Sequence, residues 1–220
     1  MRELRPGLWH WRSPHPEWGQ DSPWDQEVSS YAIDDGELLL LFDPLGVPAE
    51  LLALVPARQA AVVLTSPWHE RDTEDLVGQL GLPVYTPPRD SAQDLMDKFG
   101  ITAERAGDGS PDLLWLLRDG GGEARLYLGG DEPLPGIRAF AGREHNDLVL
   151  WLERFRAVLS GDTLADFGGG LRIPTEWLRG GVTRDQVAAG LRPLLELPVE
   201  LVLPTHGKPT DRAALEAALA

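Results

Sequence analysis

Hydrophobic residues occur in short blocks along the chain, and polar, glycine and proline residues separate the blocks. This pattern is typical of short strands and helices in a globular domain. The block AAVVLTS is apolar almost throughout, which predicts a strand buried on both faces. Asp35-Gly36 lies between two blocks and predicts a tight hairpin turn. The expected strands are 8–11, 28–34, 37–43, 60–66, 83–86, 113–119, 124–128, 136–142, 147–152, 155–162 and 199–205.

Capping residues indicate where the helices begin and end. Ser91 precedes the sequence DLMDKF, and Gly100 is expected to end that helix. Thr183 and Gln186 are spaced as a capping box, and Pro193 is expected to kink or shorten the helix that follows. Further helices are expected over 48–55, after Asp72 or Thr73, and from Asp211 onward.

The order of these elements predicts an α+β fold. Each half of the chain is rich in strands with helices after some of them, which favours two packed sheets covered outside by helices. No linker divides the chain, so residues 1–220 are expected to form a single domain. Residues 1–27 hold four of the eight tryptophans and are expected to pack on this domain. These tryptophans either fill a core or form an aromatic rim around a pocket.

The composition argues against two classes of partner, nucleic acids and membranes. Lys and Arg number 20 against 35 Asp and Glu, and a net charge of -15 argues against a nucleic-acid partner. No apolar run approaches the roughly 20 residues of a membrane span, and the N-terminus lacks the apolar region of a signal peptide. We therefore expect a cytoplasmic protein without a membrane partner, and leave its oligomeric state open. Gly168-Gly169-Gly170 lacks the strand–loop–helix setting of a nucleotide site.

Four loops that follow expected strands carry most of the chemically interesting side chains. Polar residues at such positions tend to converge, because strand ends meet at one edge of a sheet. The chain has no cysteine, so any metal must be held by His, Asp or Glu. The four segments are SPWHERD (66–72), GREHND (142–147), SGDTL (160–164) and PTHGKP (204–209).

The order of these segments resembles the metallo-β-lactamase superfamily, which includes glyoxalase II-like hydrolases. The resemblance spans roughly residues 28–210 and rests on LLLLFDP, on the strand–loop normally written T-H-x-H-x-D-H, and on SGDTL and THGKP. It implies a four-layer αββα sandwich that binds zinc or another divalent metal. It also implies a metal-bound water that attacks an ester, thioester, lactone or phosphoester. By this resemblance Asp162 is the metal-bridging carboxylate, His206 a terminal metal ligand and Asp43 a support behind the site.

The T-H-x-H-x-D-H motif is degenerate in this sequence. With Thr65 on the motif's threonine, no histidine stands at a ligand position. Those four positions hold Ser66, Trp68, Glu70 and Arg71. A shift by one residue instead places His69 and Asp72 on ligand positions.

Arginine replaces a second expected ligand in the next segment. Counting back from Asp162 places Arg143 where the family has a metal-binding histidine. His145 lies two residues beyond Arg143. A guanidinium is permanently charged and cannot bind a cation, so Arg71 and Arg143 are expected to occupy the space of the metals. An ion-pair network is expected around them, with the carboxylates of Glu70, Asp72 and Asp162.

The residues leave three interpretations open. The first is a metal-dependent hydrolase with a reduced, mononuclear site and unassigned catalytic residues. Its candidate metal ligands are His69, Asp72, His145, Asp162 and His206. The second is a catalytically inactive family member that binds a small anionic ligand or acts in regulation, with Arg71, Arg143 and Trp68 as candidate contacts. The third is a structural or interaction protein, and the tryptophan-rich N-terminal segment is the only sequence feature that favours it.

Overall fold

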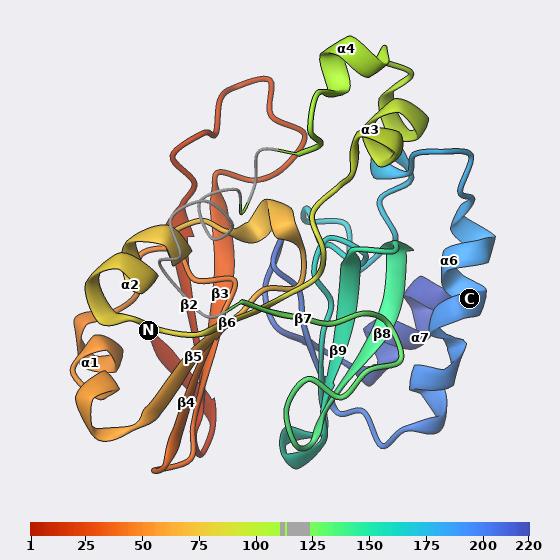
Figure 1. Ribbon diagram of the computed structural model, residues 1–220. Coiled ribbons are helices and arrows are strands. Elements are labelled where there is room, and N and C mark those ends of the chain that lie inside the picture. The colour runs from red at the N-terminus through yellow and green to blue at the C-terminus, as the bar shows by residue number, and fades with distance from the viewer. Residues whose placement is uncertain (111–112, 114–123) are drawn as a thin grey trace.

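A computed structural model of the chain describes residues 1–110, 113 and 124–220. Its strands form two sheets that lie face to face (Figure 1). The first sheet has the order β1 (Arg2–Arg5), β2 (Leu8–Pro14), β3 (Glu27–Asp34), β4 (Leu38–Phe42), β5 (Gln59–Val63), β6 (Val84–Thr86) and β7 (Ala124–Leu126). The second has the order β12 (Thr210–Asp211), β11 (Leu201–Leu203), β10 (Ala157–Leu159), β9 (Asp147–Leu152) and β8 (Ile137–Glu144).

Strand direction decides where the loops meet. In the first sheet β1 to β4 pair antiparallel, and β4 to β7 pair parallel. In the second sheet β10 and β11 are parallel neighbours. The carboxyl ends of β4, β5 and β6 therefore share one edge, as do those of β10 and β11. The loops that follow these strands carry the candidate site.

Helices cover the outer faces of both sheets, as expected for a four-layer sandwich (Figure 1). The helices α1 (Ala49–Leu52) and α2 (Thr73–Leu80) pack on the first sheet, and α6 (Arg184–Leu191) and α7 (Arg212–Leu219) pack on the second. The helices α3 (Ala92–Phe99) and α4 (Ala103–Ala106) project from one end of the sandwich, beside the loop 15–26. Within the described residues, no helix is both long enough and apolar enough to cross a bilayer.

Burial of both faces of a strand explains the apolar runs in the sequence. In β4, Leu40 and Phe42 belong to the core between the two sheets. Leu39 and Leu41, the alternate residues, belong to the core under α1 and α2. A strand with both faces covered must be apolar at every position, so LLLLF does not alternate. The fold predicted from the sequence is confirmed, including its α+β class and its four layers.

Local signals fixed most of the helix ends. Ser91 and Asp94 form a capping box at the start of α3, and the left-handed Gly100 ends that helix. Thr183 and Gln186 form the second capping box, as predicted. Helix α6 ends at Leu191, because Pro193 directs the chain into the 3₁₀ segment η5 (Arg192–Glu196).

Several predicted strands are shorter than the apolar runs that suggested them, such as 199–205, which contains only the three residues of β11. The run 155–162 begins with the 3₁₀ turn η3 (Glu153–Phe155), and Arg156 at φ 48° breaks the extended chain before β10. The run 60–66 leaves the sheet after Val63. Strand β1 was not predicted. The predicted strand 113–119 lies almost wholly outside the described residues.

Candidate metal centre and ligand pocket

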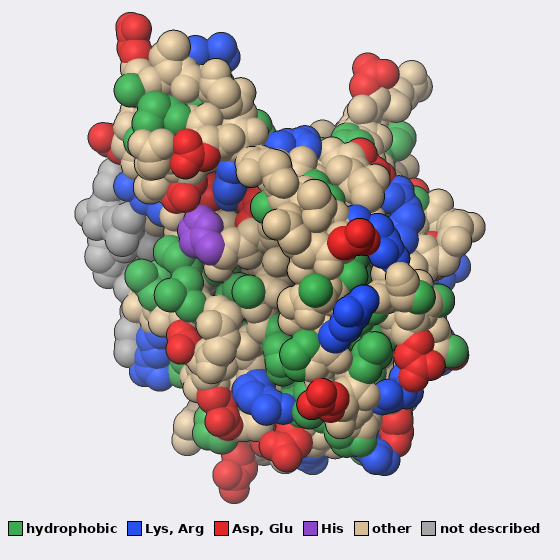
Figure 2. Space-filling model, turned by 90° about the vertical axis from the view of Figure 1, so that its right-hand side faces the viewer, with side chains coloured by type: hydrophobic (Ala, Val, Ile, Leu, Met, Phe, Trp, Pro, Cys, Tyr) green, Lys and Arg blue, Asp and Glu red, His purple; other side chains and the backbone are tan. Residues whose placement is uncertain are grey.

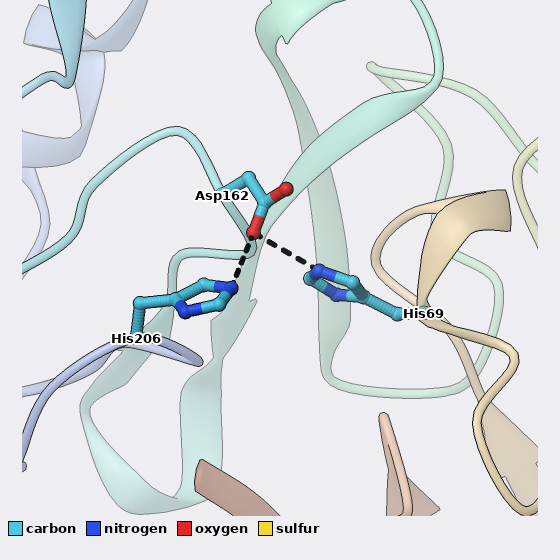
Figure 3. A group of neighbouring side chains, drawn as sticks. All are labelled: His69, Asp162 and His206. Carbon is cyan, nitrogen blue, oxygen red and sulfur yellow. Dashed lines mark hydrogen bonds and ion pairs between the residues drawn. The ribbon is translucent and has the colours of Figure 1, made fainter. Parts of the chain in front are cut away.

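Asp162 brings together two histidines from opposite sheets (Figure 3). Its Oδ1 lies 3.0 Å from Nε2 of His69 and 3.2 Å from Nε2 of His206. His69 follows β5 of the first sheet, whereas Asp162 and His206 follow β10 and β11 of the second. Figure 3 shows both imidazoles turning one nitrogen toward the same carboxylate oxygen. The centre therefore lies where the loop edges of the two sheets meet.

The backbone after β5 turns His69 into this centre. Ser66 caps the 3₁₀ turn η2 (Pro67–His69), which places the ring against the end of β4. There Oδ2 of Asp43 lies 3.2 Å from Nδ1 of His69. Asp43 is itself held by Thr65, whose N–H and hydroxyl donate to its two oxygens at 2.8 and 2.6 Å. A buried carboxylate thus fixes the orientation of His69 from behind.

The charges around His69 change its protonation. Burial by itself lowers the pKa of the imidazole, but Asp162 and Asp43 on either side raise it to about 9. His206 has no second carboxylate, and burial lowers its pKa although Asp162 opposes this. Burial raises the pKa of Asp162, but His69, His206 and Arg143 outweigh it and hold that pKa well below its usual range. Without a metal, His69 is therefore a cation between two carboxylates.

Arg143 is fully engaged by the protein on the other side of Asp162. Its Nη2 lies 3.0 Å from Oδ2 of Asp162, and its Nε lies 2.7 Å from Oδ2 of Asp147. Its Nη1 donates to the carbonyl of Trp177 at 3.0 Å. Burial lowers the pKa of Arg143, but the two carboxylates more than compensate and raise it. This guanidinium therefore pairs with Oδ2 of Asp162, whereas the two histidines face Oδ1.

Arg71 is held in a different way, by neutral groups. Its Nη1 donates to the carbonyl of Asp43 at 2.7 Å and to that of Ser29 at 3.2 Å. Both Arg71 and Asp43 have a left-handed backbone, with φ of 46° and 44°. Such a conformation is strained for residues with a side chain and persists where the surrounding structure enforces it. The strain lies next to the three converging side chains.

A pocket of about 340 Å³ opens above these residues. The loop 15–26 and helix α3 form its two walls, and Figure 2 shows a hollow between two projections at that end of the molecule. Aromatic residues form much of the wall. The lining comprises His15, Glu17, Pro23, Trp24, Trp68, His69, Arg71, Asp90, Lys98, Phe99, Arg143, Glu144, Asp162, Trp177, Arg179 and His206.

Two candidate metal ligands lie outside the centre. Asp72 stands before α2, and its carboxylate accepts a hydrogen bond from the N–H of Gly46. His145 is 46% exposed at the turn between β8 and β9, with Nε2 3.9 Å from Oδ2 of Asp94. Aligning the motif one residue later places both His69 and Asp72 on ligand positions. In the structure His69 lies in the centre and Asp72 does not. The tight turn after Ser66 is what brings His69 inward.

The expected ion-pair network forms around Arg143 rather than around both arginines. Arg143 pairs with Asp162 and with Asp147, a carboxylate the sequence did not single out. Glu70 accepts a hydrogen bond from the N–H of Leu113. In the described part of the chain, no carboxylate oxygen lies within ion-pairing distance of the Arg71 guanidinium.

Several pocket residues have no signal in the sequence. Lys98 reaches from α3 to Asp90 at 2.5 Å and also pairs with Glu144. His15 enters from the tryptophan-rich loop, and its Nδ1 accepts the N–H of Glu17. Only the tryptophan cluster around His15 hinted at an aromatic rim, and nothing in α3 pointed to Lys98.

Three donor groups are close enough together to hold a metal ion. Ligand atoms of His69, Asp162 and His206 all lie within 4.8 Å of one another. Two imidazoles and one carboxylate are a known set for zinc or iron, and Asp43 behind His69 is the usual supporting carboxylate. A second ion would need further donors, but Arg143 covers the other oxygen of Asp162. Metal uptake must also displace the proton that His69 carries.

Comparisons with solved structures identify the architecture. No protein-family model and no curated protein sequence matches the chain. The DIM-1 metallo-β-lactamase matches with a TM-score of 0.61 and 14% identity, over 99% of this chain and 93% of that one. The metallo-β-lactamase from Erythrobacter litoralis matches with a TM-score of 0.62 and 14% identity over the same shares. TTHA1623 in a di-iron-bound form is 28% identical, over 89% of this chain and 94% of that one, with a TM-score of 0.55.

Proposed function

Because this chain has the metallo-β-lactamase fold, we propose that it is a hydrolase-like protein with a mononuclear metal site. The observation that carries the proposal is the convergence of His69, Asp162 and His206 on one point at the floor of a pocket. One of the similar structures, TTHA1623, is described in a di-iron-bound form. The replacement of two expected ligands by arginine favours one ion in this chain.

The residues around the centre have distinct roles in this proposal. When bound, a divalent ion makes water a nucleophile near neutral pH and polarises a substrate carbonyl or phosphoryl group. His69, Asp162 and His206 would hold it, and Asp43 keeps the His69 ring in place. Arg71 lies in the same pocket, where its fixed positive charge suits an anionic group of the substrate. Substrates with an ester, thioester, lactone or phosphoester bond suit this chemistry.

A second candidate function follows from Arg143. Its guanidinium already neutralises Asp162, so the centre is also stable as a metal-free ion-pair network. In that case the chain is a catalytically inactive family member that binds a small anionic ligand or acts in regulation. The two candidates differ in whether the protein holds a metal.

Activity assays with matched variants test the hydrolase proposal. The protein is loaded with zinc, iron or manganese and tested on chromogenic ester, thioester, lactone and phosphoester substrates. We expect hydrolysis that needs the metal and falls by about 100-fold or more in Asp162→Asn. Glu104→Gln, on the exposed helix α4, is the control and keeps full activity. Hydrolysis that survives both chelation and Asp162→Asn would contradict the proposed centre.

A further inference from the structure

Arg71 is a half-buried cation of the pocket that forms no ion pair with any described residue. Lys98 pairs with Asp90 and Glu144, and Arg143 pairs with two carboxylates. Arg179 is exposed, so water solvates it. Among the described residues, the Arg71 guanidinium donates only to two backbone carbonyls and to the hydroxyl of Ser30. The carboxylates of Asp43, Asp72 and Asp162 act on Arg71 from a distance, but none of them contacts it. A charge in such a position is stabilised further by an anion in direct contact, so the position favours an anion from outside the chain.

The bonding of Arg71 also determines which edge of its guanidinium is available. All its hydrogen bonds to described residues use Nη1. Nε is buried without a partner. The hydrogen bonds of Arg71 to described residues leave Nη2 unused. The N–H groups of Nε and Nη2 point in parallel along one edge of the group. A pair of parallel donors matches the two oxygens of a carboxylate.

Two further orphaned polar atoms belong to residues of the same pocket. Among the described residues, five buried side-chain atoms lack a hydrogen-bond partner, and three of them are Nε of Arg71, Nε1 of Trp24 and Nδ1 of His206. Buried polar groups are normally paired, so each exception asks for an explanation. The atoms of Arg71 and Trp24 are donors, and a ligand that accepts hydrogen bonds would pair them.

The walls of the pocket indicate what the anion is attached to. Trp24, Trp68 and Trp177 line the pocket together with Phe99. Trp68 is 41% exposed and Phe99 is 52% exposed, which is unusual for side chains of this size. A ligand with an apolar or aromatic body would cover both surfaces.

The charge balance of the pocket favours a single negative charge. Arg71, Arg143, Lys98 and Arg179 face four carboxylates, those of Glu17, Asp90, Glu144 and Asp162. A dianion such as a phosphate monoester would meet these carboxylates as well as Arg71. Because these four cations and four carboxylates balance, they leave no excess positive charge for a dianion, whereas a monoanion on the free edge of Arg71 needs only that one cation.

We propose that the pocket selects a monocarboxylate with an apolar or aromatic body, its carboxylate bound side-on by Nε and Nη2 of Arg71 and its body packed on Trp24, Trp68 and Trp177. This inference rests on the pocket of the proposed function and names its substrate or ligand class. It does not depend on the metal. Arg143 has no part in binding the anion, since the protein uses all three of its nitrogens.

Calorimetric titration of chelator-treated protein tests the proposal with probes that differ in charge only. The probes are 4-phenylbutyrate and 4-phenylbutyramide, with acetate for the missing body and phenyl phosphate for a dianion. We expect the acid to bind about tenfold or more tightly than the amide, with acetate and phenyl phosphate weaker than the acid. Equal binding of acid and amide, no binding of the acid at millimolar concentration, or a preference for phenyl phosphate would overturn the proposal.

Variants then assign the preference to its residues. Arg71→Met should remove the preference for the acid, whereas Arg179→Met, at another arginine of the same pocket, should keep it. Arg71→Lys keeps the charge without the paired donors, and should weaken acid binding about tenfold if Arg71→Met does not fold. Trp68→Ala should weaken acid and amide by a similar factor. A preference that persists in both Arg71 variants would contradict the proposal.

The outcome is independent of the hydrolase proposal. Because the titration uses metal-free protein, a carboxylate cannot bind through an ion. Selective binding in a chain that never holds metal would leave this inference intact and remove the hydrolase. Metal-dependent hydrolysis without any preference for the acid would do the reverse.

Discussion

The side chain of Asp162 joins the two halves of the centre at the residue scale. One of its oxygens faces His69 and His206, and the other faces Arg143. Arg143 in turn binds Asp147, whose pKa burial raises to about 6 although Arg143 acts in the opposite direction. The arginine at a ligand position therefore supplies the positive charge that keeps two buried carboxylates ionised. Removal of that arginine should cost far more than removal of a surface arginine.

Replacement of Arg143 by methionine measures this contribution. We expect Arg143→Met to lower the free energy of unfolding by about 3–5 kcal/mol, since it removes the cation paired with buried Asp147 and one of the cations paired with Asp162. Arg138→Met in the same strand is the control, and should cost about 0.5 kcal/mol or less because Arg138 is exposed. Urea denaturation followed by circular dichroism gives both values. Equal losses in the two variants would contradict the account of Arg143.

Helix α3 shows at the scale of an element how the pocket wall is attached. Most of the helix projects away from the sandwich, and of its residues only Leu95 is fully buried. Lys98 fastens it, because its ammonium group reaches Asp90 after β6 and Glu144 at the end of β8. Asn146 also donates to Asp90 at 2.7 Å. The wall thus depends on the two ion pairs of Lys98 more than on hydrophobic packing.

Loss of Lys98 should release this helix without unfolding the domain. In Lys98→Met we expect the amides of α3 to exchange with deuterium about tenfold or more faster, while those of β4 and β9 keep their protection. The control is Gln93→Ala, at an exposed position of the same helix. Hydrogen–deuterium exchange with mass spectrometry resolves the segments. Unchanged exchange in α3, or a uniform rise across the domain, would refute the role given to Lys98.

At the scale of the whole molecule, hydrogen bonds join the two sheets near the centre. Ser29 in β3 donates its hydroxyl to the carbonyl of Gly207 at 2.7 Å, and Tyr31 donates to the carbonyl of Pro204 at 2.8 Å. His10 lies behind this link, with Nε2 2.9 Å from the hydroxyl of Ser29. The Ser29 hydroxyl already donates its proton to the carbonyl of Gly207. In the bond with His10 that hydroxyl oxygen must therefore accept, and Nε2 of His10 must carry the donated proton. A neutral His10 fits this arrangement.

The pH dependence of stability tests the state of His10. Burial, together with nearby Arg12 and Arg2, lowers the pKa of His10 to about 4, so the unfolded chain binds a proton at a pH where the folded chain does not. This contribution to stability is complete above pH ~6.5 and is lost as the pH falls toward the folded pKa. Between about pH 7.5 and about pH 5, the wild type should lose about 2 kcal/mol more than His10→Gln. Urea titrations of both proteins at each pH decide this, and equal losses would show that His10 is not a buried neutral group.

The sequence predicted those parts of the molecule that depend on local contacts. Ser91 and Thr183 act within their own helices, and Asp162 and His206 directly follow strands, so their positions could be expected. The inward turn of His69 depends on a bond to Asp43 from another strand. The roles of Lys98 and His15 depend on contacts across the fold, which no periodicity in the sequence encodes.

Metal content tests the central claim most directly. Protein purified without a polyhistidine tag is incubated with zinc at neutral pH, washed, and measured by elemental analysis per chain. Asp162→Ala, His206→Ala is the matched double variant, with circular dichroism to establish that it folds. A mononuclear centre predicts close to one ion per chain in the wild type and none in the folded double variant. No ion in the wild type, or two ions per chain, would contradict the account.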